Sequence, residues 1–269
     1  MTDFSAITSA SDRYNLHCHT QFCDGYSLME DFVRRAIDEG FTHLGFTPHS
    51  VVPIESPCNI RRCDVQPYFD EVARLREEYG RYLIIYAAME IDYLGSDWGP
   101  SHPYFDTLPL DYRIGSVHFV PTREGELVDM DGRPERFAER LAKHFGGDLR
   151  YVVETYFDQS MKMVEAGGFH IIGHFDKISN NASHVKPGVE NEPWYRERID
   201  ELIVSIIDHR LTVEINTKQW LEFKRFSPSA RYFSRLKQAA IPLVVNSDSH
   251  HAHLLNAGRD EALRLLNDA

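Results

Sequence analysis

Short apolar segments alternate with longer amphipathic segments along most of the chain. In the clearest apolar run, residues 82–90, nearly every position before Glu90 is apolar, which predicts a strand buried on both faces. Shorter runs predict six further strands, at residues 14–16, 43–47, 112–117, 171–173, 211–216 and 242–246.

Helical periodicity fills most of the intervals between these strands. Ser27 and Glu30 have the spacing of a capping box, and Gly40 is suited to end the helix that follows. Further helices are expected at residues 64–79, 134–145, 149–166, 193–209, 229–239 and 260–266. This alternation predicts an α/β fold with a parallel sheet, either a closed barrel or an open doubly wound sheet.

Nine metal-ligating side chains decide between these two architectures, because most of them end or follow predicted strands. They are His17, His19, Asp24, His49, Glu90, His118, His174, Asp248 and His250. An open sheet would spread them along a line, whereas a closed barrel brings the carboxyl ends of its strands together around one axis. The pattern therefore favours a single-domain α/β barrel with a site at its C-terminal face.

These nine side chains are too many for one metal ion, since a catalytic zinc takes roughly three protein ligands. Clusters of ions about 3.5–4 Å apart are typical of enzymes that cleave phosphate esters. Three divalent ions, three carboxylates and one bridging hydroxide would leave a net charge of about +2, which complements a phosphomonoester dianion. We therefore expect attack on phosphorus by a metal-bridging hydroxide, with Asp248 or a nearby histidine as candidates to protonate the leaving alkoxide.

The charge and hydrophobicity of the chain indicate which kinds of partner to expect. With 29 basic and 41 acidic residues the formal net charge is −12, so we expect no nucleic-acid partner and a small anionic substrate instead. No apolar run approaches the ~18 residues of a membrane span, and the start of the chain lacks the pattern of a signal peptide. We expect a cytoplasmic protein with free thiols, without a membrane partner, as a monomer or homodimer.

The motifs around the nine residues resemble those of the polymerase-and-histidinol-phosphatase (PHP) family, and most closely its stand-alone histidinol-phosphate phosphatases. The resemblance to the family rests on Leu16-His-Cys-His-Thr20, Asp24, Thr47-Pro-His49, Met89-Glu90, Gly115-Ser-Val-His118, Gly173-His174 and Asn246-Ser-Asp-Ser-His250. The closer resemblance to the histidinol-phosphate phosphatases rests on Phe22-Cys-Asp-Gly25, Tyr112-Arg-Ile-Gly-Ser-Val-His-Phe119, Gly173-His-Phe-Asp-Lys177 and Val213-Glu-Ile-Asn-Thr-Lys218. It implies a distorted (β/α)7 TIM-like barrel over residues 13–269, after a polar N-terminal segment at residues 1–12. It also implies hydrolysis of L-histidinol phosphate to L-histidinol and phosphate in histidine biosynthesis.

The resemblance further implies three divalent ions, whether zinc, iron or manganese, each with its own ligand set. His17, His19, Glu90 and Asp248 would hold the first ion, Asp24, His49 and His250 the second, and Glu90, His118 and His174 the third. Glu90 would bridge the first and third ions. The catalytic residues expected on this basis are Glu90, Asp248 and His250.

Substrate contacts are expected from the loops after the fifth and sixth predicted strands. Lys177, Lys218 and Arg225 are the cations expected to bind phosphate. Three alternatives remain open: a related phosphoesterase acting on nucleotides or sugar phosphates, an amidohydrolase, and a non-catalytic metal-binding module. An exonuclease would want a basic groove, which the net charge disfavours.

Overall fold

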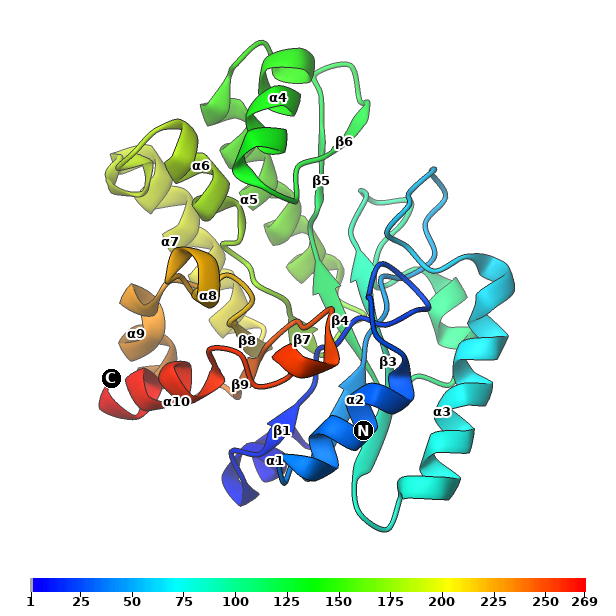
Figure 1. Cartoon of the computed structure of the whole chain (residues 1–269). Coiled ribbons are helices and arrows are strands. Elements are labelled where there is room, and N and C mark those ends of the chain that lie inside the picture. The colour runs from blue at the N-terminus through cyan, green and yellow to red at the C-terminus, as the bar shows by residue number, and fades with distance from the viewer. Residues whose placement is uncertain (1) are drawn as a thin grey trace.

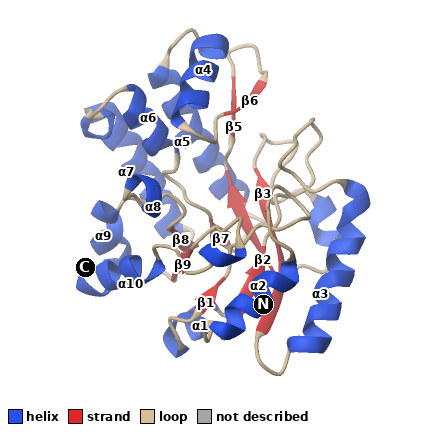
Figure 2. Cartoon of the chain, viewed as in Figure 1, coloured by secondary structure: helices blue, strands red, loops and turns tan. Residues whose placement is uncertain are grey.

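Seven parallel strands surround a common axis (Figures 1 and 2). The computed structural model describes residues 2–269. The strands follow the order β1-β2-β3-β4-β7-β8-β9 and run parallel to their neighbours. Their bounds are β1 Tyr14–Asn15, β2 His43–Phe46, β3 Ile84–Asp92, β4 Tyr112–Ser116, β7 Ile171–Ile172, β8 Thr212–Asn216 and β9 Leu243–Asn246.

The first and last strands of this order nearly close the ring. Beyond the strand ends, Cys18 and Ser249 form a parallel bridge in which the His19 amide donates to the Ser249 carbonyl at 2.9 Å. The Leu16 amide donates to the side chain of Asn246 at 2.8 Å. The predicted distorted (β/α)7 barrel in a single α/β domain is therefore confirmed.

Most of the helices lie around the outside of the barrel, and others cover its two ends (Figure 1). The helices are α1 Phe4–Ala10, α2 Met29–Asp38, α3 Val65–Tyr79, α4 Pro134–Phe145, α5 Leu149–Ala166, α6 Ile178–Val185, α7 Pro193–Asp208, α8 Trp220–Phe223, α9 Phe233–Gln238 and α10 Arg259–Asp268. The expected bounds of α4 and α5 agree with the structure. Within residues 2–269, none of these helices combines the length and apolar character needed to cross a membrane.

The predicted cap of α2 is wrong by one residue. Leu28 precedes the helix, and its amide donates to the Asp31 carboxylate at 3.1 Å. The Ser27 hydroxyl instead accepts from the amide of Ala252, at 3.0 Å. The Ser27 hydroxyl therefore makes a tertiary hydrogen bond instead of capping the helix, as local spacing had predicted.

The N-terminal segment differs from the expectation of a polar stretch outside the barrel. Residues Phe4–Ala10 form α1, and both Phe4 and Ile7 are buried. Phe4 meets the ring of Tyr112 edge-to-face, with centroids 5.5 Å apart. The two apolar positions therefore make this segment part of the barrel core, although most of its other residues are polar.

An antiparallel hairpin was not foreseen from the pattern. It consists of β5 Phe119–Pro121 and β6 Leu127–Asp129, and it extends beyond the C-terminal end of β4 toward α4 (Figure 1). The short helices α6 and α8 were also missed. These three elements follow β4, β7 and β8 along the chain, so they build up the end of the barrel that carries the predicted site.

Candidate metal centre

All nine predicted side chains meet at the C-terminal end of the barrel. Most of them stand on the segments just past strand ends, and Glu90 lies within β3. His174 and Asp248 have φ values of 22° and 48°, in the left-handed region that residues with a Cβ seldom adopt. Such strained positions are held in place by the surrounding structure and concentrate at functional sites.

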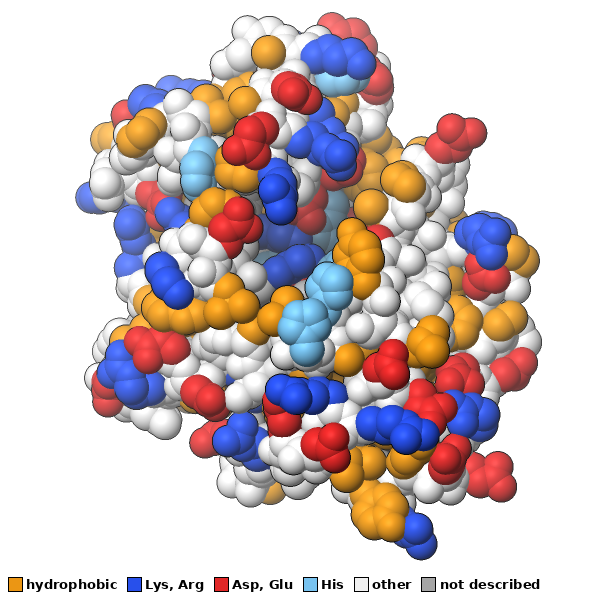
Figure 3. Space-filling view, viewed as in Figure 1, with side chains coloured by type: hydrophobic (Ala, Val, Ile, Leu, Met, Phe, Trp, Pro, Cys, Tyr) orange, Lys and Arg blue, Asp and Glu red, His pale blue; other side chains and the backbone are white. Residues whose placement is uncertain are grey.

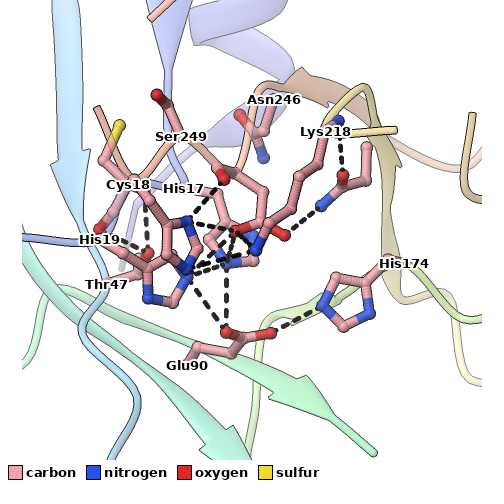
Figure 4. A network of polar contacts seen from close by, with 12 residues as sticks. His17, Cys18, His19, Thr47, Glu90, His174, Lys218, Asn246 and Ser249 are labelled. Atoms are coloured by element: carbon pink, nitrogen blue, oxygen red, sulfur yellow. Dashed lines mark hydrogen bonds and ion pairs between the residues drawn. The ribbon is translucent and has the colours of Figure 1, made fainter. Parts of the chain in front are cut away.

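Glu90 faces five of the histidines, and its side chain is 1% exposed. Figure 4 shows its carboxylate among His17, His19 and His174. Its Oε1 lies 2.8 Å from His174 Nε2 and 3.5 Å from His118 Nε2. Its Oε2 faces three more imidazole nitrogens, those of His17 at 3.3 Å, His19 at 3.3 Å and His49 at 3.1 Å. The two carboxylate oxygens thus point to different groups of histidines, which is the arrangement that a bridging ligand needs.

Asp248 and Asp24 complete the cluster. Asp248 Oδ1 lies 3.1 Å from His19 Nε2, and Asp24 Oδ1 lies 3.3 Å from His250 Nε2. His19 takes part on both sides, because its Nδ1 is 3.7 Å from Asp24. Three ligand groups can be formed from the nine residues, namely His17/His19/Asp248, His19/Asp24/His49/His250 and Glu90/His118/His174.

Several oxygen and nitrogen atoms of this cluster that could ligate a metal ion have no hydrogen-bond partner, although they are shielded from solvent. They include Asp24 Oδ1, Glu90 Oε2 and His118 Nε2. In addition, His17 Nε2 and His19 Nε2 face each other at 3.1 Å. Buried polar atoms without partners are costly, and a divalent ion among them would satisfy them. The donor set therefore fits divalent metal ions.

Electrostatics within the cluster favour the neutral form of some imidazoles and the protonated form of others. Burial, together with the nearby His19, lowers the pKa of His49 to about 3, and burial with Lys218 lowers the pKa of His250 to about 4. Both imidazoles are therefore neutral at pH 7. Burial opposes protonation of His17, yet Glu214, Asp248 and Glu90 raise its pKa to about 10. An ion bound at His17 would replace that proton.

A cavity of about 430 Å³ opens above the cluster. Figure 3 shows a hollow on this face with Lys and Arg side chains inside it. The cavity is lined by His49, His118, His250 and Asp24 from the cluster, and by both predicted lysines, Lys177 and Lys218. A small ligand can therefore reach the candidate metal centre from solvent.

The family model of the PHP domain matches residues 15–218, about three quarters of the chain. The chain belongs to the PHP family. Two curated relatives are similar over 88% of this chain. A probable histidinol-phosphatase from Schizosaccharomyces pombe is 26% identical and covered to 80%, and a histidinol-phosphatase from Bacillus subtilis is 24% identical and covered to 92%.

Solved structures share the fold of this PHP protein at low sequence identity. A Listeria monocytogenes protein has a TM-score of 0.82 at 19% identity, with 92% of this chain and 99% of that chain covered. A histidinol phosphate phosphatase from Lactococcus lactis, solved with zinc, L-histidinol and phosphate, has a TM-score of 0.72 at 18% identity. The match covers 96% of this chain and 93% of that one.

Two buried carboxylates beside the PHP cluster were not assigned a role from the sequence. Glu214 Oε1 lies 2.7 Å from His17 Nδ1, and Asp92 Oδ1 lies 2.6 Å from His118 Nδ1. Each orients an imidazole whose other nitrogen faces the cluster, an arrangement that fixes the tautomer of metal-ligating histidines. The sequence did contain a signal for each of them. Glu214 is an acidic residue within a predicted apolar strand, and Asp92 lies two positions after Glu90, on the same face of its strand.

The three predicted phosphate-binding cations lie in different surroundings. Lys218 Nζ is 3.3 Å from both Asp248 Oδ1 and His250 Nε2, next to the cluster. Lys177 is buried and donates to Asp131 at 2.7 Å. Arg225 does not line the cavity. Its guanidinium donates to Ser179 at 3.0 Å and to the buried Glu190, so the structure does not bring it to the site.

Proposed function

We propose that this PHP protein is a metal-dependent phosphatase that hydrolyses L-histidinol phosphate to L-histidinol and phosphate, in histidine biosynthesis. The central support is the position of Glu90, whose two oxygens face five histidines below an open cavity. The names of the two curated relatives and the ligands of the Lactococcus lactis structure support the choice of substrate.

Three divalent ions would occupy the centre in this proposal. The first would use His17, His19, Glu90 and Asp248, the second Asp24, His49 and His250, and the third Glu90, His118 and His174. When bound, such ions act as Lewis acids toward phosphoryl oxygens and lower the pKa of water toward ~7. The ions also add positive charge, which an acidic protein needs in order to hold a phosphate dianion.

Lys177 and Lys218 would bind the phosphate oxygens that face the cavity. Both side chains line the cavity. Burial alone would lower the pKa of Lys177, but the nearby Asp131 carboxylate raises it well above its usual range, so the ammonium stays charged. A cation fixed by a buried carboxylate needs little rearrangement when an anion arrives. We assign no phosphate contact to Arg225, because Glu190 already binds its guanidinium.

The proposed catalytic residues are Glu90, Asp248 and His250. Glu90 joins two parts of the centre, so it sets the positions of the groups around phosphorus. Asp248 and His250 each lie 3.3 Å from Lys218 Nζ, and they hold this ammonium at the cavity floor. There Lys218 can donate a hydrogen bond to the departing ester oxygen, which offsets its developing negative charge.

Phosphate release from a panel of phosphomonoesters tests the proposal. The metal-loaded protein is assayed with L-histidinol phosphate, a nucleoside monophosphate, a sugar phosphate and a generic aryl phosphate. We expect the highest kcat/KM for L-histidinol phosphate. If this substrate is turned over no faster than the aryl phosphate, the proposed substrate is wrong. Preference for the nucleotide or the sugar phosphate would support the alternative PHP phosphoesterase.

A further inference from the structure

Glu222 lies in the cavity wall, beyond the cluster of proposed metal ligands. It belongs to α8 and follows Lys218 by four positions, and both residues line the cavity. Glu222 is exposed, and its carboxylate makes no hydrogen bond or ion pair to any residue between 2 and 269. A carboxylate beside a proposed phosphate site repels a ligand that carries only negative charge. A ligand that also carries a positive group would be attracted to Glu222.

The other carboxylates that line the cavity already have a role or a partner inside the protein. Asp24 is a proposed metal ligand, and the remaining pairs are Asp92 with His118 at 2.6 Å, Asp129 with Arg140 at 3.0 Å and Asp131 with Lys177 at 2.7 Å. Glu222 is therefore the acidic side chain of the described cavity lining that remains available to a ligand.

Trp220, the first residue of the helix that carries Glu222, is held by aromatic packing. Trp220 stacks face-to-face on Phe226, with ring centroids 4.6 Å apart and an interplanar angle of 1°. Gly258 lies against Trp220 so closely that an added Cβ would meet the indole side chain at 2.7 Å. Because α8 is anchored in this way, Glu222 is presented from a defined position rather than from an unconstrained loop.

Two aromatic side chains also line this cavity. Phe223 neighbours Glu222, and Tyr26 is 77% exposed while its ring stacks on His251 at 4.6 Å. An exposed aromatic ring held by stacking offers a flat apolar face to a planar group at low conformational cost. The wall thus combines one free carboxylate with surfaces suited to a ring.

We propose that Glu222 binds the protonated amine of the leaving group and thereby sets substrate specificity. The class of substrate is an amine-bearing phosphomonoester, with a planar ring of the leaving group lying against Tyr26 or Phe223. The inference rests on the proposed function, since it places phosphate on the lysine side of the cavity. Glu222 itself takes no part in bond cleavage.

Matched substrate pairs test this role. The first pair is L-histidinol phosphate and its analogue without the amine, and the second is O-phosphoethanolamine and ethyl phosphate. The ratio of kcat/KM within each pair is measured for the unmodified protein and for Glu222→Gln. We expect the preference for the amine to fall about five- to ten-fold, as for a charge-assisted hydrogen bond at a solvent-accessible position.

Glu77→Gln is the matched control. Glu77 is exposed on α3 and does not line the cavity, so this variant makes the same change in net charge and should keep both ratios. Glu222→Lys should reverse the preference and favour an acidic leaving group, such as that of phosphoglycolate. Unchanged ratios in both Glu222 variants would overturn the inference.

The second pair separates this inference from the proposed substrate. If L-histidinol phosphate proves a poor substrate while the ratio for the alkyl phosphates still depends on Glu222, the substrate assignment fails and the inference holds. For slowly hydrolysed compounds, the same ratio is taken from inhibition of aryl phosphate hydrolysis. If L-histidinol phosphate is preferred but Glu222→Gln leaves its ratio unchanged, the inference fails and the proposed function stands.

Discussion

Glu214 Oε1 lies 2.7 Å from His17 Nδ1, and neither side chain is exposed to solvent. The other oxygen of Glu214 accepts from the amide of His174 at 3.1 Å and from Asn216 at 3.0 Å. One buried carboxylate therefore positions residues from three strand ends. Glu214 is not a member of the nine-residue cluster, but it orients two members of it.

Replacing Glu214 with Gln should weaken metal binding without abolishing the fold. The amide keeps the shape of the side chain but removes the charge that raises the basicity of His17. Loss of such supporting partners typically costs about 10- to 100-fold in metal affinity. Competition with a chelator measures this affinity, and Asp92→Asn gives the same test at His118. Unaltered affinity in both variants would contradict the positioning role.

Glu90→Ala should lose at least two of the three proposed ions. The carboxylate faces His17, His19 and His49 with one oxygen and His118 and His174 with the other, so its removal affects two ion positions together. Elemental analysis of the purified protein gives the metal content, and Glu77→Ala is the control. Circular dichroism verifies the fold. Loss of fewer than two ions would show that Glu90 does not bridge.

A close contact inside the barrel predicts a stability effect at Gly45. A Cβ at Gly45 would lie 1.8 Å from the hydroxyl of Tyr112, which donates to the Leu16 carbonyl at 2.6 Å. Gly45→Ala should lower the free energy of unfolding by about 1–3 kcal/mol, the usual cost of overpacking. In the background of Tyr112→Phe the clash is smaller, so the cost should be smaller as well. Strictly additive costs in urea denaturation would refute this explanation.

The sequence predicts the barrel and the ligand cluster because both follow local rules. Each proposed ligand lies at or near a strand end, and parallel strands of a barrel bring those ends together. Glu214 could not be given its role in this way, since its partner His17 lies 197 positions away. That contact forms because the nearly closed ring brings β8, which only β9 separates from β1, close to the segment after β1.

Arg225 and Phe4 illustrate two further limits. A cation in a loop after a strand is a reasonable phosphate ligand, yet only the structure shows that Glu190 binds Arg225. Likewise, two apolar residues in a polar segment do not reveal which surface they cover. Phe4 packs on Tyr112, more than one hundred positions later. Side-chain pairing across long sequence separations accounts for both differences.

Lys177→Met should weaken the binding of inorganic phosphate. The ammonium is proposed to contact the phosphate, and a hydrogen bond from a charged group is worth about 1.5–3 kcal/mol, or roughly 10- to 100-fold in affinity. Competitive inhibition by phosphate measures the change. In Lys177→Met, Asp131 loses the ammonium that lies 2.7 Å away and would itself repel phosphate. The double variant Lys177→Met/Asp131→Asn controls for this effect. Full phosphate affinity in both variants would exclude a direct contact.

Two arginines at the cavity rim should speed the arrival of anionic substrate. Arg133 and Arg136 line the cavity, are exposed, and form no ion pair within the described residues 2–269. In a protein of net charge −12 they supply local positive potential at the entrance. Replacing both with Gln should lower kcat/KM by about 3- to 10-fold at low salt and leave kcat nearly unchanged, because steering acts on encounter.

The salt dependence of this effect separates steering from a direct contact. Charges at an exposed rim are screened at ionic strengths where the Debye length is about 8 Å or less, so the difference between the two proteins should shrink as salt is added. Arg81→Gln/Arg210→Gln makes the same change in net charge at residues just before β3 and β8, at the opposite end of the barrel. That control should retain the kcat/KM of the unmodified protein. A loss that persists at high salt would instead mean that Arg133 or Arg136 touches the bound substrate.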